Sequence, residues 1–243
     1  MDWQIVIDSL PRYAEPLWVT VQVTLGSAAV ALFVAFGLGL MTSSKHLIVR
    51  TPARIVVEFF RGSSVIVQLF WFAYAMPQLL GFQFDYAIMV GIMALGLNYG
   101  SYSSEVVRAA IGAVPKGQWE AATALSLSPW TRTWRVVIPQ AWPEMIPSLT
   151  SFAVMLLKAS ALVSMVSIID LTAMANTIGR VPGNELLVQY GFLLVVYFIL
   201  AWLIWSGMRL LERRAKRGIG IGARPSKKAL ADGHGVQASG GAM

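Results

Sequence analysis

The chain has 243 residues, of which 56% are hydrophobic and 13% are charged, and its formal net charge is +7. In an ordinary soluble domain about one quarter of the residues are charged. This composition therefore excludes an ordinary soluble domain and indicates an integral membrane protein. The sequence holds no cysteine, which excludes disulfides and thiolate metal sites. Its two histidines, His46 and His234, lie too far apart in sequence for a metal cluster. We therefore expect neither a metal nor a cofactor in this chain.

Five segments are long and apolar enough to cross a bilayer, whose hydrocarbon core of about 30 Å takes roughly 20 helical residues. In chain order they are, approximately, Leu17–Met41, Ile55–Leu80, Tyr86–Ile111, Met145–Leu171 and Leu187–Leu211. They predict an all-α integral membrane protein with five transmembrane helices, in which residues 1–212 form the membrane domain. Residues 213–243 are basic and rich in Gly and Ala, and we expect them to form a disordered tail.

The distribution of Lys and Arg predicts the orientation of these spans. One side of the membrane receives 15 of the 19 cations, from two polar connections and the tail. The other side receives only Arg12 and Arg180, while Arg61 and Lys158 fall within spans. By the positive-inside rule the N-terminus lies outside and the C-terminus in the cytoplasm. No nucleic-acid partner is expected for the basic tail, because such segments usually anchor to the lipid surface.

A polar insert, about residues 112–144, joins the third and fourth spans on the cytoplasmic side. Good helix formers predict a first helix over Gln118–Leu127. Ser128 followed by Pro129 is typical of an N-cap and first helical position. A second helix is predicted from Trp130 to about Ile138, ending before Pro139, since proline disfavours helix in the residue before it.

Neither of these short helices is stable alone in water, so they need a surface to pack on. Ala121 and Ala122 are expected to be exposed and to allow another protein to approach closely. The residues alone leave two alternatives open. The insert either docks on a partner or caps the helix bundle of its own chain.

The insert resembles the cytoplasmic signature of ATP-binding-cassette importer permeases. That signature reads Glu-Ala-Ala, three residues, Gly, and then about nine residues to an Ile/Val-x-x-Pro ending. Glu120, Ala121 and Ala122 match its start, and Val137-Ile138-Pro139 match its end. Ser126 stands at the glycine position, where a positive φ costs a serine on the order of 1 kcal/mol.

Three further phrases are similar to the polar-amino-acid uptake branch of that family, so that the resemblance covers roughly residues 12–212. They are EFFRGSSVIVQLFW, LNYGSYSSEVVRAAIGAVPKGQWEAA and LLKASALVSMVSIIDL. The branch usually has Thr-Pro where this chain has Ser63 and Ser64. It usually has an acid where this chain has Ala159.

The resemblance implies that the insert is a coupling helix docked in a groove of a separate ATPase subunit. Glu120 would be the polar anchor and the two alanines would allow close contact. The sequence has no G-x-x-x-x-G-K-[ST] phosphate loop, so ATP and magnesium are expected in that partner. The resemblance also implies a second permease chain, identical or paralogous, and an external solute-binding protein. The expected location is the bacterial inner membrane.

Polar groups within the spans are the candidates for a substrate path, because a charge inside a bilayer is costly. Asn98 and Lys158 are predicted near mid-depth, where transporters tend to hold substrate. Ser164 shares the helical face of Lys158, and Ser160 and Arg61 are weaker candidates. Lys158 is expected either to contact a substrate carboxylate or to pair with an acid of this or a partner chain. Two further pairs have the i, i+3 spacing of helix-orienting ion pairs: Glu58 with Arg61 and Glu105 with Arg108.

Three functions compete at this point. The first is the membrane subunit of an ATP-driven importer for a polar amino acid or a similar zwitterionic solute, such as an opine or ectoine. The second is a stand-alone secondary transporter, against which the odd number of spans and the scarcity of intramembrane acids both argue. The third is a membrane enzyme, for which no set of catalytic residues is evident.

Overall fold

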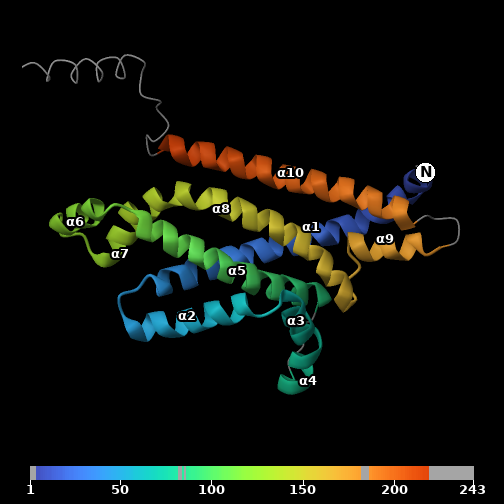
Figure 1. Ribbon diagram of the computed structural model, residues 1–243, viewed down its shortest axis with the longest axis horizontal. Helices are drawn as coiled ribbons and strands as arrows, with labels where there is room; N and C mark the ends of the chain where they lie inside the picture. The colour runs from blue at the N-terminus through green and yellow to red at the C-terminus, as the bar shows by residue number, and fades with distance from the viewer. Residues whose placement is uncertain (1–3, 82–83, 85, 182–185, 219–243) are drawn as a thin grey trace, which may run out of the picture.

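The computed structural model describes residues 4–81, 84, 86–181 and 186–218, and within these ranges its regular elements are all helical (Figure 1). The predicted all-α class is confirmed. The α-helices are α1 (Gln4–Thr42), α2 (Leu47–Gly62), α3 (Val65–Phe70), α4 (Met76–Leu80), α5 (Ala87–Ala113), α6 (Lys116–Ala124), α7 (Pro129–Arg132), α8 (Ile138–Ala159), α9 (Leu171–Gly179) and α10 (Leu186–Gly218). Turns of π-helix at η1 (Trp71–Ala75) and η2 (Thr133–Val137) and a 3₁₀-helix at η3 (Ser160–Val166) connect some of them.

The central contact of the bundle is the parallel packing of α1 on α5. A Cβ added at Gly96 would come within 2.6 Å of Val30, and one added at Gly100 within 2.7 Å of Val34. The contacting positions advance in the same direction along both helices, so the helices run parallel. Small residues allow this close approach in lipid, where helices associate by packing.

The other two long helices, α8 and α10, pack beside this central pair. α10 starts beside the start of α1, where the hydroxyl of Tyr13 donates to Oε1 of Gln189 over 2.8 Å. Farther along α10, Met208 packs against the apolar cluster that contains Ala35 of α1 and Met145 of α8. α8 runs in the opposite direction, and α6 and α7 lie at the end of the bundle away from the N-terminus (Figure 1).

Three helical stretches are long and apolar enough to cross a membrane, namely Ser9–Thr42, Pro129–Val166 and Leu186–Arg217. They contain the predicted first and fifth spans and most of the fourth. α5 is less apolar, but its 27 residues cover about 40 Å, enough for a bilayer core. Since α5 lies parallel to α1, the chain between them must return along the length of α5.

This returning segment is not the straight helix predicted over Ile55–Leu80. α2 and the stretch Val65–Leu80 meet at an angle of 101°, and α3 and α4 turn away from the long helices (Figure 1). Ser63 and Ser64 have extended backbones, with ψ of 151° and 131°. Two consecutive extended residues end α2 and redirect the chain.

The prediction that the second insert helix ends before Pro139 is also wrong. Helix continues from Pro129 through Pro139 to Val166. The π-helical turn η2 immediately precedes α8, and such a turn is a known way to accommodate an irregularity inside a helix. The predicted fourth span therefore begins too late, and it also ends too late, because Ser167 with φ of 63° terminates the helix.

Two further differences concern the last third of the chain. The short helix α9 was not predicted; Asp170 caps it by accepting a hydrogen bond from the amide of Ala173 over 2.9 Å. Residues 213–218, which were assigned to the disordered tail, belong to α10. The rest of the predicted tail, with His234, lies outside the described residues.

Candidate functional site

The corner between α6 and α7 is the feature that positions the Glu-Ala-Ala motif. Ser126 takes a φ of 55°, the left-handed conformation that favours glycine, as the sequence pattern indicates for this position. The amide of Leu127 then donates to the carbonyl of Ala122 over 3.2 Å, and the amide of Ser126 to that of Thr123 over 2.9 Å. These are the bonds of a helix C-terminus closed by one left-handed residue.

α7 starts directly after this corner. The predicted N-cap is present, because the amide of Thr131 donates to Oγ of Ser128 over 3.3 Å and Pro129 occupies the first helical position. α7 continues through η2 into α8, and Val137 and Ala141 are fully buried beside α1 and α5. The corner is therefore joined to a continuous helix anchored in the core.

Side chains also hold α6 against α7 and α8. Arg132 donates from Nη1 to Oγ1 of Thr123 over 2.9 Å, and its guanidinium carbon lies 5.5 Å from the centre of the Trp119 ring. Gln140 donates from Nε2 to Oε1 of Gln118 over 3.2 Å. One face of α6 is thus occupied by its own chain.

Only part of the Glu-Ala-Ala motif remains available to a partner. Glu120 and Ala121 are exposed, and within the described ranges the carboxylate of Glu120 has no ion pair or hydrogen bond. Ala122 is 3% exposed, so the expectation that both alanines are exposed is wrong for this one. It lies four residues after Gln118, on the helix face that packs against α7 and α8.

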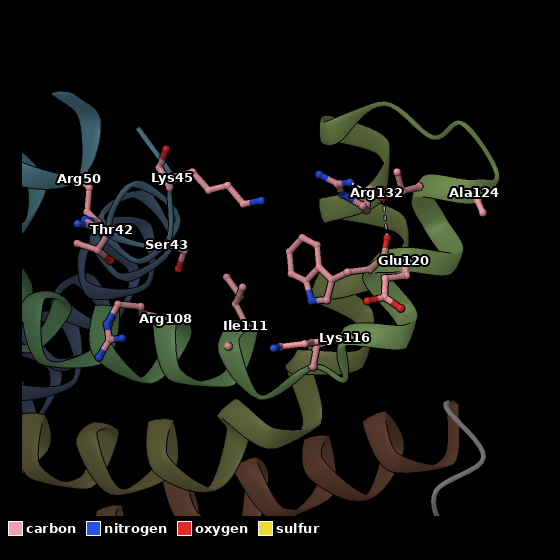
Figure 2. Close-up of a pocket in the computed structure, with 15 residues that line it drawn as sticks. Thr42, Ser43, Lys45, Arg50, Arg108, Ile111, Lys116, Glu120, Ala124 and Arg132 are labelled. Carbon is pink, nitrogen blue, oxygen red and sulfur yellow. Dashed lines mark hydrogen bonds between the residues drawn. The ribbon is translucent and has the colours of Figure 1, made fainter. Parts of the chain in front are cut away.

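A cavity of about 880 Å³ lies beside α6, between it and the connection from α1 to α2 (Figure 2). We call it the basic hollow, because its lining includes Lys45, Arg50, Arg108, Lys116 and Arg132, with Glu120 as the one carboxylate among its lining residues. These cations are not adjacent in the sequence, because they come from four helices and the connection between α1 and α2.

The second polar region is the break between α2 and α3. The carbonyl of Phe60, freed by the end of α2, accepts hydrogen bonds from Nδ2 of Asn98 and Nε2 of Gln68, each over 2.9 Å. The carbonyl of Arg61 accepts from the hydroxyl of Tyr102 over 3.0 Å. The break is held by side chains of α3 and α5, because buried carbonyls without partners are costly.

Arg61 lies in the same region. Its Nη1 is 3.7 Å from Oε1 of Glu58, and its guanidinium carbon is 5.4 Å from the centre of the Tyr102 ring. The second pair lies farther along α5, where Nη2 of Arg108 is 2.6 Å from Oε2 of Glu105. Both acid–base pairs expected from the i, i+3 spacing are thus in contact.

The remaining substrate-path candidates lie at the end of α8 that is far from α6, and in the 3₁₀-helix η3 that follows it. Lys158 is exposed and has no ion pair in the part of the chain that the structure describes. The hydroxyl of Ser160 is fully buried and donates to the carbonyl of Leu157, and the half-buried Ser164 donates to that of Ala161. Of these three side chains, only that of Lys158 is open to a ligand in this conformation.

Gln68 and Tyr102 are the polar residues that the sequence analysis missed. An amide and a phenol in otherwise apolar helices were available signals, since a polar side chain in a membrane segment needs a partner. No group of three or more acids and histidines able to hold a metal ion occurs among the described residues.

The sequence of this chain is similar to those of known proteins. The family model described as "Binding-protein-dependent transport system inner membrane component" matches residues 19–217. A probable amino-acid ABC transporter permease of Sinorhizobium fredii, y4tF, is 38% identical over 89% of this chain and 91% of its own. The L-cystine transport system permease TcyB of Bacillus subtilis is 31% identical over 88% and 92%.

A solved structure has the same fold. The crystal structure of an amino acid ABC transporter with histidines contains a chain that superposes with a TM-score of 0.78 and 28% identity. The match covers 88% of this chain and 99% of that one.

The shared carbonyl at the break gives a testable non-additivity. In Asn98→Leu or Gln68→Met alone, Phe60 keeps one donor, whereas the double variant leaves its carbonyl without either donor. We expect the loss of unfolding free energy in the double variant to exceed the sum of the single losses by about 1 kcal/mol or more. Denaturant unfolding of the purified variants measures this, and simple additivity would contradict it.

The strained corner gives a second prediction. Ser126→Gly removes the cost of the positive φ and should stabilise the protein by about 1 kcal/mol. Ser126→Ala keeps a Cβ in the same conformation and serves as the control without a gain. Thermal unfolding of both variants measures the change in stability. An equal shift of the unfolding temperature in the two would show that the positive φ is not the cause.

Proposed function

The chain belongs to the family of binding-protein-dependent transport system inner membrane components, and we propose that it carries a polar amino acid or a similar zwitterionic solute from the periplasm to the cytoplasm. Members of this family are the membrane subunits of ATP-driven importers, and the ATPase activity lies in a separate subunit. Membership therefore decides against a stand-alone secondary transporter and against a membrane enzyme. Relatives named for amino acids, including cystine, support the proposed substrate class; an opine or ectoine remains part of the proposal.

We place the ATPase contact on the exposed face of α6. The observation that carries this proposal is the free carboxylate of Glu120 beside exposed Ala121, on a helix fixed by the Ser126 corner to a continuous helix of the bundle. A short helix tied in this way transmits a displacement of its outer face into α8. Magnesium and ATP would be bound by the partner.

The cations support the proposed orientation. Lys45, Lys116 and Arg132 line the hollow beside α6, and the last turn of α10, with Lys216 and Arg217, lies at the same end of the bundle (Figure 1). Arg12 and Arg180 belong to the elements at the other end. By the positive-inside rule the α6 end faces the cytoplasm and the N-terminal end faces the periplasm.

The proposed assembly contains further subunits. A second permease chain, identical or paralogous, would complete the wall around a central path. A solute-binding protein would deliver substrate at the periplasmic end. Lys158, the exposed cation without an ion pair at the far end of α8, is the proposed contact for a substrate carboxylate.

The ATPase contact is tested by Glu120→Arg and by Ala121→Trp. We expect both variants to insert normally, to lose the ATPase on copurification and to lose ATP-dependent uptake, because an exposed docking face meets a reversed charge or a bulky ring. Ala122 is unsuitable for this test, since a larger side chain at a buried site also overpacks the chain itself.

The matched control is Glu15→Arg, the same charge change at an exposed position on α1 at the other end of the bundle. It should retain both the ATPase and uptake. Wild-type uptake by Glu120→Arg and Ala121→Trp would contradict the assignment of α6 as the contact.

The role of Lys158 is tested by Lys158→Met and Lys158→Arg. If the ammonium binds a substrate carboxylate, Lys158→Met loses uptake of a zwitterionic solute while ATPase assembly stays intact, and Lys158→Arg retains part of the activity. Uptake in proteoliposomes and copurification of the ATPase measure the two properties. Failed assembly in Lys158→Met would instead indicate an ion pair with a partner chain.

A further inference from the structure

The basic hollow is formed by two parts of the chain that are far apart in sequence. One wall is the connection between α1 and α2, from Thr42 to Arg50, and the opposite wall is α6 with the start of α7. The last turn of α5, with Ile111, and the following residue Val114 line the space between the two walls with apolar side chains. Figure 2 shows Lys45 reaching into this space from one wall and Lys116 and Arg132 from the other.

The charges in the hollow are not balanced within the chain. Arg108 is paired with Glu105, but Lys45, Arg50 and Lys116 have no acid within ion-pair distance in the described parts of the chain. Arg132 has a hydroxyl and an aromatic ring as partners and no carboxylate. Glu120 alone offsets four cations, so the hollow carries a net positive charge.

Some of these cations are fixed in place. Arg132 is half-buried between Thr123 and Trp119, and its Nε is buried without a hydrogen-bond partner. Arg50 is also half-buried. A set of like charges held in a concave site with partly apolar walls produces a focused positive potential, which attracts an anionic partner.

We propose that the basic hollow receives an acidic segment of the ATPase subunit, beside the groove that takes α6. This inference rests on the proposed function of α6. Two observations select a protein segment as the occupant. The hollow is continuous with the exposed face of α6, since Glu120 and Ala124 belong to its lining. Its 880 Å³ and its cations on opposite walls exceed what a single carboxylate or phosphate group spans.

The consequence is a second point of attachment for the ATPase. An acidic segment between Lys45 and Lys116 bridges the α1–α2 connection to α6. A displacement of the ATPase then acts on α8 through the corner and on α1 and α2 through the hollow. Electrostatic contacts of this kind contribute mainly to specificity and association rate and weaken with salt.

The test compares two triple variants that each remove three cations from the same end of the bundle. The first is Lys45→Gln/Arg50→Gln/Lys116→Gln, in the hollow. The second is Arg213→Gln/Arg214→Gln/Arg217→Gln, on exposed positions of α10 outside it. The probe is the ATPase subunit that copurifies with the tagged full-length chain, rebound to each variant in lipid nanodiscs at about 0.05 and 0.5 M NaCl, a range over which screening changes strongly.

We expect the hollow variant to bind the ATPase roughly tenfold more weakly at low salt and with a flatter salt dependence. The α10 variant should bind like the wild type. Equal weakening in both variants would show that only general surface charge matters and would overturn the proposal. Size-exclusion chromatography checks folding, and if the hollow triple variant misfolds, Lys45→Gln and Lys116→Gln are measured singly with the same expected direction.

The results distinguish a failure of this inference from a failure of the proposed α6 contact. If Glu120→Arg loses the ATPase while the hollow variant binds it normally, the α6 contact stands and the hollow is not part of it. If neither change affects binding, both proposals fail. Lipid mass spectrometry adds a third arm: loss of a copurified anionic phospholipid from the hollow variant, with ATPase binding unchanged, would identify the hollow as a lipid site and overturn the proposal.

Discussion

The left-handed backbone of Ser126 is the constraint on which the proposed coupling depends. It turns the chain between α6 and α7 with only Leu125–Ser128 outside a helix. Because α7 continues without interruption into α8, a force on α6 acts on a helix that reaches the buried core. The contacts of Arg132 with Thr123 and Trp119 add stiffness to the corner. A flexible loop at the same place would absorb the displacement.

The break between α2 and α3 is a second place where a few specific residues determine the path of the chain. α1 and α5 run parallel, so the chain between them has to recross the bundle. It does so with a bend at which the carbonyls of Phe60 and Arg61 have no partner within the helix. Asn98, Gln68 and Tyr102 supply the missing donors. Asn98, considered from the sequence as a substrate contact, thus has a structural partner in this conformation, as does Arg61. Of the substrate-path candidates, Lys158 is left as the exposed cation without an ion pair among the described residues.

Sequence patterns predicted features that depend on local chemistry. Long apolar runs located α1, α5 and α10, the i, i+3 spacing located the ion pairs, and Ser128-Pro129 located the start of α7. They failed where distant residues, or an irregular local backbone that hydropathy does not register, decide the outcome. The donor for Phe60 is 38 residues away, hydropathy does not register two extended serines, and the loss of one amide at Pro139 is absorbed by a π-helical turn. The burial of Ala122 depends on how α6 packs against α7 and α8, which its own sequence does not specify.

A single crosslink tests the central claim most directly. The chain contains no cysteine, so Ala121→Cys introduces one thiol on the exposed face of α6. A short heterobifunctional photocrosslinker attached to this thiol in the native membrane should join the chain to a separate ATPase subunit, identified by mass spectrometry of the adduct. Adducts confined to the chain itself or to lipid, with the ATPase present in the same membranes, would contradict the assignment of α6 as the docking helix.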